Sequence, residues 1–141
     1  MALHTETEIY KATYDLSKLV TELVSNMRRN YKADFGADLR KHCMTLVRRT
    51  YQANTREDKV LVLQRMREEV EEVNLSLRLA VDLRLISRGQ YARAIALTTS
   101  IAKQANGWQK HSASALAAGS SRRSGQRAIE SGRAAGPQAH R

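Results

Sequence analysis

Positively charged side chains gather between Asp38 and Glu57, an interval that contains no acidic residue. Five positions in it carry lysine or arginine, namely Arg40, Lys41, Arg48, Arg49 and Arg56. Lysine and arginine neutralise phosphates and release the counterions around a nucleic acid, which gives salt-sensitive binding with little sequence preference. A merely solvated helix usually mixes the two signs, because opposite charges four residues apart attract each other. The segment therefore predicts a phosphate-binding surface.

The same basic residues also have a structural interpretation. Acidic residues gather further along the chain, at Glu68, Glu69, Glu71 and Glu72. Antiparallel packing, within a bundle or across subunits, would bring them to the arginines. We favour phosphate binding over this pairing, and we expect the acidic run to be a solvated face rather than a dock for a basic polymerase. Arg28, Arg29 and Lys32 form a second basic cluster at the end of the first expected helix, where phosphate binding and the helix macrodipole account for the charges equally well.

The residue types that usually carry catalysis are scattered along the chain. The histidines at positions 4, 42, 111 and 140 have no neighbour three or four residues onward that completes a metal site. Cys43 falls on an apolar stripe, so we expect a small core residue rather than a nucleophile activated by His42. Neither a Walker A loop nor a dinucleotide-binding glycine pattern occurs. The sequence therefore predicts no catalysis, no metal and no cofactor.

Apolar residues recur every three to four positions over four segments, which is the spacing of amphipathic helices. The predicted helices cover residues 6–30, 37–53, 56–84 and 88–110. Three capping pairs precede helices, namely Thr5 with Glu8, Thr55 with Asp58, and Ser87 with Gln90. Short connections predict an all-α, antiparallel, up-down-up-down four-helix bundle over residues 1–110. Most tyrosines fall on the apolar stripes and are expected in the core, while Trp108 is expected in the core or at a subunit interface.

Charge and composition divide the chain into two parts. The whole chain has 141 residues and a net charge of +10, and residues 1–110 alone carry 19 basic and 13 acidic side chains. Residues 111–141 are mostly alanine, glycine, serine and arginine, so they cannot bury enough apolar surface to offset their ordering entropy. We expect a flexible, disordered basic tail there. A single cysteine, with neither a membrane-length apolar run nor a signal-peptide layout, predicts a cytoplasmic protein without a membrane partner.

One stretch of sequence carries a resemblance to a known family. It contains Arg78-Leu79-Ala80-Val81-Asp82-Leu83, then Ile86-Ser87 and Tyr91, and a Gly107-Trp108 pair follows. This pattern resembles the Avd-like four-helix-bundle family, the accessory variability determinants of diversity-generating retroelements, over about residues 9–110. Within the stretch, Arg78 and Asp82 are four residues apart on one helix and are expected to form an ion pair.

The resemblance implies a homopentamer of bundles that performs no chemistry itself. It also implies association with the retroelement's reverse transcriptase and with template RNA or cDNA, through a basic surface that supports mutagenic reverse transcription. The alternative is a structural or scaffolding bundle, similar to proteins encoded in rRNA intervening sequences, with protein partners and no nucleic-acid role. The residues expected to bind nucleic acid are Arg28, Arg29, Arg40, Lys41, Arg48, Arg49 and Arg56.

Overall fold

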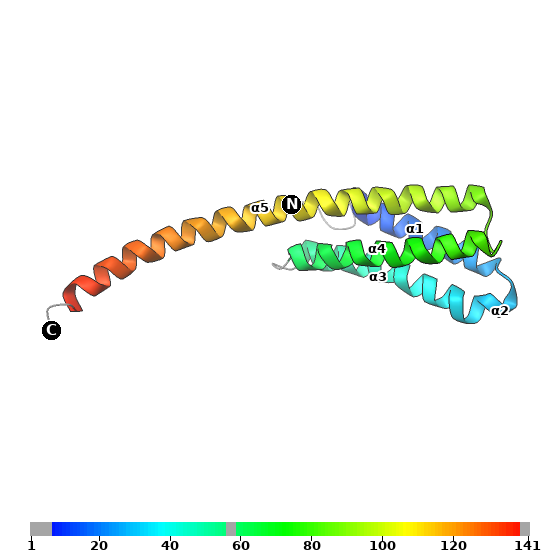
Figure 1. The fold of residues 1–141 in the computed structure, drawn as a ribbon, viewed down its shortest axis with the longest axis horizontal. Coiled ribbons are helices and arrows are strands. Elements are labelled where there is room, and N and C mark those ends of the chain that lie inside the picture. The colour runs from blue at the N-terminus through cyan, green and yellow to red at the C-terminus, as the bar shows by residue number, and fades with distance from the viewer. Residues whose placement is uncertain (1–6, 56–58, 139–141) are drawn as a thin grey trace. The chain divides into compact units, whose positions relative to one another are not determined.

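The computed structural model describes residues 7–55 and 59–138. Four long helices follow one another, α1 (Glu8–Ser25), α3 (Ala37–Thr55), α4 (Lys59–Asp82) and α5 (Arg88–Gln138). Short connections join them in alternating directions (Figure 1), and α3 packs against both α1 and α4. The described residues contain no strand. The structure confirms the predicted all-α, up-down-up-down four-helix bundle.

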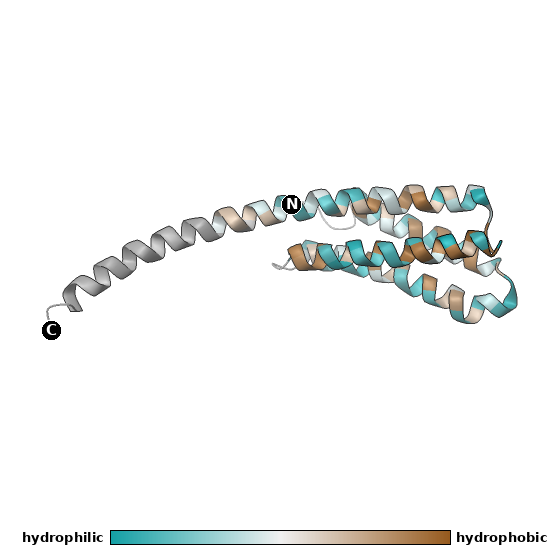
Figure 2. Ribbon diagram, in the orientation of Figure 1, coloured by the Kyte–Doolittle hydropathy of each residue, from teal (hydrophilic) through white to brown (hydrophobic). Residues whose placement is uncertain are grey.

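The core is built from one apolar stripe of each helix. Figure 2 shows hydrophobic and hydrophilic residues alternating along the helices. The fully buried side chains include Leu16 and Val20 of α1, Leu39 and Leu46 of α3, Leu63, Met66, Val70 and Leu77 of α4, and Ile101 of α5. Burying such side chains removes apolar surface from water, worth about 25 cal/mol per Å². The stripes face inward, so the charged positions between them are left on the outside.

The first helix ends earlier than the sequence predicted. α1 stops at Ser25 rather than near residue 30. A short helix, α2 (Arg29–Tyr31), and a π-helix, η2 (Lys32–Gly36), follow it and lead directly into α3. Thr7 is the N-cap of α1, since its hydroxyl accepts a hydrogen bond from the amide of Tyr10 at 3.3 Å. The predicted cap residue Thr5 lies outside the described residues.

The other two predicted caps have different outcomes. Ser87 and Gln90 form the reciprocal capping box before α5: the Ser87 amide donates to the Gln90 side chain at 2.8 Å, and the Gln90 amide donates to the Ser87 hydroxyl at 3.1 Å. Thr55 is the last residue of α3 and its hydroxyl donates to the Tyr51 carbonyl, but the amides that it was predicted to cap lie outside the described residues. Asp58 lies outside the described residues.

Helix α5 continues past residue 110, where the sequence predicted its end, and reaches Gln138. Alanine, which is abundant there, is the strongest helix former, so a segment too polar to pack can still be helical. The internal contacts of the chain divide it into Met1–Gln109 and Lys110–Arg141. The flexibility predicted for residues 111–141 stays a prediction. Among the described residues, none of the helices combines the length and apolarity that crossing a membrane requires.

Gly36 is the residue that lets η2 approach α1. A Cβ at this position would lie 2.5 Å from Cγ1 of Val24, which is buried in the core. We therefore expect Gly36→Ala to lower the free energy of unfolding by about 1–3 kcal/mol, because overpacking forces the neighbours to move. Urea denaturation followed by circular dichroism measures this.

Gly107 provides the matched control for Gly36. It also lies within a helix, but a Cβ there would meet nothing within 4 Å. Gly107→Ala should raise the stability by about 0.5–1 kcal/mol, because alanine loses less backbone entropy than glycine in a helix. Equal stabilities of the Gly36→Ala variant and the wild type would show that the close approach is not required.

Candidate nucleic-acid interface

The outward surface of α3 carries an exposed basic strip, defined here as Arg40, Lys41 and Arg48. Successive residues turn by about 100° in a helix. This rotation places Lys41 and Arg48 opposite Leu39 and Leu46, which are buried in the core, and it places Arg40 beside them, about 100° from Leu39. The position of the strip follows from α3 itself, because the apolar stripe fixes which side faces inward.

The remaining predicted site residues of this region lie elsewhere. Arg49 is half-buried and turns toward the side that faces α4, where it donates to Oε1 of Gln52 at 3.0 Å. Arg56 lies outside the described residues. The structure therefore brings three of the five predicted cations onto one exposed surface.

The described residues offer no carboxylate partner to these cations. Their ion pairs are His42–Asp38, His42–Glu69 and Arg78–Asp82, and none of them involves the basic strip or Arg49. The run of glutamates does meet α3, but through Glu69, whose partner is His42 instead of an arginine. Pairing within the described part of the bundle is therefore not what holds the arginines, and pairing across subunits stays a prediction. The ion pair predicted between Arg78 and Asp82 is confirmed, at 3.2 Å.

Two tyrosines beside the basic strip are exposed, which corrects the expectation of a core position for these two, whereas Tyr91 is partly buried against the core. Tyr14 of α1 is 49 % exposed and Tyr51 of α3 is 50 % exposed. Tyr14 stacks on Tyr10 with ring centroids 6.1 Å apart, and Nζ of Lys18 lies 5.5 Å from the Tyr14 ring centroid. A basic surface with exposed aromatic rings is typical of sites that bind single-stranded nucleic acid.

A groove of about 370 Å³ lies between α1 and α3 next to Tyr14. Its lining includes Tyr10, Tyr14 and Lys18 from α1 and Met44 and Val47 from α3. We call this groove, together with the basic strip and Tyr51, the α1–α3 face. The sequence indicates that Tyr14 is exposed, because it lies off the apolar stripe of α1 and between Lys11 and Lys18. This exposure is missed when tyrosine is treated as a large apolar residue.

The second predicted cluster has a different structural role from the one expected. Arg28 and Arg29 are exposed, but α1 ends at Ser25, so they do not complement the macrodipole of its last turn. Arg28 instead donates from Nη2 to the carbonyl of Leu83 at 3.2 Å, just beyond the end of α4. Its guanidinium also lies 5.3 Å from the ring centroid of Tyr31.

His42 of α3 contacts two carboxylates, and one of them, Glu69, joins α3 to α4. One ring nitrogen bonds to Glu69 of α4, and the other lies 3.2 Å from Asp38 of α3. Partial burial lowers the pKa of His42, but the hydrogen bonds and charges of Glu69 and Asp38 outweigh it, so its pKa is raised above the ordinary 6.5. The imidazolium is thus the form that these contacts favour.

Cys43 is fully buried next to His42 in sequence. Burial, and to a smaller extent the charge of Glu69, raises the pKa of its thiol to about 12. A thiol with that pKa stays protonated at neutral pH and is a poor nucleophile. Among the described residues, no group of three histidine, cysteine or acidic side chains is arranged to hold a metal ion.

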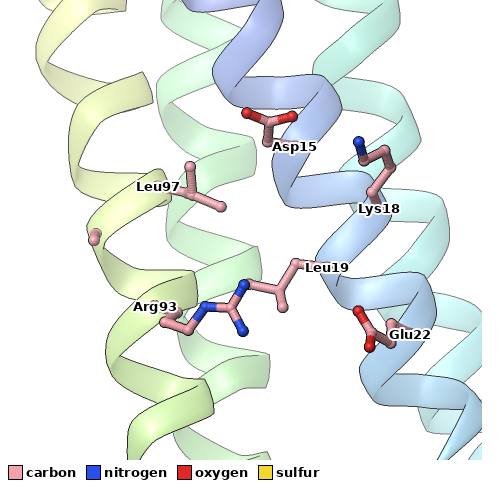
Figure 3. A pocket seen from close by; sticks show the side chains of 7 residues that line it. Asp15, Lys18, Leu19, Glu22, Arg93 and Leu97 are labelled. Carbon is pink, nitrogen blue, oxygen red and sulfur yellow. The ribbon is translucent and has the colours of Figure 1, made fainter.

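A further groove of about 490 Å³ lies between α1 and α5 (Figure 3). Asp15, Lys18 and Glu22 come from α1, and Arg93 comes from α5. Two acidic and two basic side chains balance each other here. The groove therefore lacks the single sign of charge that attracts a polyanion, in contrast to the α1–α3 face.

The His42 contacts predict a pH dependence of stability. The pKa of His42 is raised in the folded state, so its stabilising contribution is complete below about pH 6.5 and is lost as the pH rises through the folded-state pKa. The wild type should exceed His42→Gln in free energy of unfolding by more at about pH 5.5 than at about pH 8.5. Urea denaturation at the two pH values measures the difference.

His111 provides the control for this measurement, because it is exposed and lies outside the contact between α3 and α4. For His111→Gln, the difference from the wild type should be small and equal at both pH values. A difference for His42→Gln that does not change with pH would contradict the role of the imidazolium.

The comparison with known families agrees with this architecture. A family model described as bAvd-like matches residues 8–112, from the first residue of α1 into α5. The search of curated proteins found no match. The matched range includes every helix of the bundle and the segment from Arg78 to Tyr91 on which the sequence resemblance rested. The chain thus belongs to the bAvd-like family.

Proposed function

We propose that this protein is a non-catalytic accessory protein that binds single-stranded nucleic acid through its α1–α3 face. In this proposal it assists the reverse transcriptase of a diversity-generating retroelement by holding template RNA or cDNA. The observation that carries the proposal is the exposed basic strip of Arg40, Lys41 and Arg48, which has no carboxylate partner among the described residues.

The mechanism is electrostatic first and aromatic second. The strip attracts phosphates and releases their counterions, which supplies affinity without sequence preference. Exposed rings then add base stacking, worth about 1–3 kcal/mol per base. Tyr14 is half-exposed beside Lys18 and is suited to that role. A template must be bound whatever its sequence, and both interactions tolerate every base.

A surface for protein partners lies on α4. Three leucines are exposed on one side of this helix, namely Leu61, Leu75 and Leu79, and Glu68 and Glu72 fall on the same side by helical rotation. An apolar face bordered by acidic residues fits either a neighbouring copy of the bundle or a basic polymerase surface. Assembly into a homo-oligomer, a pentamer by family resemblance, would also multiply a weak basic strip into a stronger binding surface.

The exposed leucines also favour a second candidate function, a scaffolding bundle with protein partners alone. Leu75 is 68 % exposed, more than any other large apolar side chain identified as exposed in the described chain. A gel-shift with an unrelated RNA separates the two functions. Retardation at low salt supports nucleic-acid binding, and no retardation supports the scaffold.

Removing two cations from the basic strip should lower the salt dependence of binding. For Arg40→Gln with Arg48→Gln, the slope of log K against log salt should become less steep by about 1.4, since each phosphate contact with a single strand contributes about 0.7. Fluorescence anisotropy with a labelled single-stranded RNA over a range of KCl concentrations measures this. Arg65→Gln with Lys103→Gln is the matched control, because both residues are exposed on other helices. If the two double variants have equal slopes, the strip is not the binding surface.

The contribution of Tyr14 to binding should change the affinity without changing its salt dependence. Tyr14→Leu keeps an apolar side chain but removes the ring, so affinity should fall by about 5-fold or more while the salt slope stays unchanged. The same anisotropy titration measures both quantities. An affinity equal to that of the wild type would exclude stacking on Tyr14.

A further inference from the structure

A large cleft lies at the end of the bundle where α1 and α4 end and α5 begins. Its volume is about 990 Å³, larger than the grooves between α1 and α3 and between α1 and α5. Asn26 follows α1, Arg78 and Asp82 belong to the last turns of α4, and Arg88 begins α5. The segment that carries the family resemblance therefore surrounds a cavity to which the α1–α3 face contributes nothing.

The cleft has an excess of positive charge. Asp82 is the one carboxylate among the described residues of its lining, and it already forms the ion pair with Arg78. The side chains of Arg84 and Arg88 are both exposed, and neither guanidinium forms an ion pair or hydrogen bond with the described residues. Two guanidinium groups are thus left without an anionic partner in a concave surface.

Arg84 occupies a backbone conformation that favours glycine. Its φ is 60°, and it is the only described residue other than glycine with a positive φ. Its amide donates to the Val81 carbonyl, and the amide of Leu85 donates to the Ala80 carbonyl, which together form the Schellman turn that ends α4. Glycine usually occupies this position because a Cβ is strained there. The arginine therefore costs stability in the free protein.

Arg88 also occupies an unfavourable position. It is the first residue of α5, and the first turn of that helix contains no acidic residue. The N-terminus of a helix carries the positive end of its macrodipole and repels a cation. The macrodipole of α4 attracts a cation at its C-terminus, which accounts for the charge of Arg84. No such attraction accounts for the charge of Arg88 at the start of α5. An anion bound between the two arginines would offset both costs.

We propose that this cleft binds phosphates of a single-stranded nucleic acid through Arg84 and Arg88. The inference rests on the proposed function and adds a second contact site to the α1–α3 face. Guanidinium groups form paired hydrogen bonds with phosphate oxygens. The half-buried ring of Tyr91 also lines the cleft and gives a base a surface for stacking. An acidic peptide would use the two arginines but would not need the Tyr91 ring, so we favour the nucleic acid.

The experiment uses the full-length chain with Arg84→Gly and Arg88→Gln combined. Glycine relieves the strain at residue 84, and glutamine removes the cation from the start of α5, so the melting temperature should rise. A loss of binding in this variant cannot therefore result from unfolding. The probes are a fluorescein-labelled single-stranded RNA of mixed sequence and a labelled polyglutamate peptide, each titrated by anisotropy over a range of KCl concentrations.

We expect the RNA salt slope of this variant to become less steep by about 1.4, as for two lost phosphate contacts, while Arg65→Gln with Lys103→Gln keeps the slope of the wild type. An unchanged slope in the cleft variant, with a reduced slope in Arg40→Gln with Arg48→Gln, would overturn the cleft and leave the proposed function intact. A reduced slope in the cleft variant, with an unchanged slope in Arg40→Gln with Arg48→Gln, would exclude the α1–α3 face as the binding surface and support the cleft. Loss of polyglutamate binding with unchanged RNA binding would assign the cleft to an acidic peptide and overturn the inference.

Discussion

Uncompensated positive charge on the outer side of α3 is the constraint on which the account depends. The apolar stripe of α3 is fixed by its contacts with α1 and α4, so Arg40, Lys41 and Arg48 must face outward. Among the described residues, the carboxylates of α4 do not neutralise them: Glu69 contacts His42, and the neighbouring glutamates fall on other sides of the helix. Cations that repel one another are stabilised by an anion from outside the chain.

The fold holds this surface in place from two directions. His42 connects α3 to α4 through Glu69, and the Ser17 hydroxyl of α1 donates to the sulfur of Met44 at 3.2 Å. At the start of α3, Gly36 allows η2 to pack against Val24. A surface displayed by a helix that is fixed on both sides loses less conformational entropy when it binds a strand, so weak contacts contribute more to affinity.

The sequence was sufficient to predict the bundle, because apolar spacing, short connections and the capping box of Ser87 and Gln90 all indicate the same helices. The details that it missed have separate physical causes. The π-helix contains a tertiary contact, the packing of Gly36 on Val24, which no local sequence pattern records. The tyrosines were misplaced because a ring with a hydroxyl is stable in the core and at the surface alike.

The candidate site was predictable in its charge but not in its geometry. The absence of acidic residues between Asp38 and Glu57 located the cations, and helical rotation separated Arg48 from the buried stripe. The direction of Arg49, the partnership of Arg28 with Leu83, and the positive φ of Arg84 depend on neighbouring helices and on a turn that the residue types did not indicate. In particular, glycine is the usual signal for a Schellman turn, and here arginine takes its place.

The most direct measurement is the affinity of the full-length wild-type protein for a single-stranded nucleic acid as a function of salt concentration. Phosphate contacts made by several lysines and arginines require log K to fall linearly and steeply with log salt, by about 0.7 for each contact. That result would show that the exposed cations capture a polyanion. An affinity that does not change with salt, or no binding at low salt, would contradict the account.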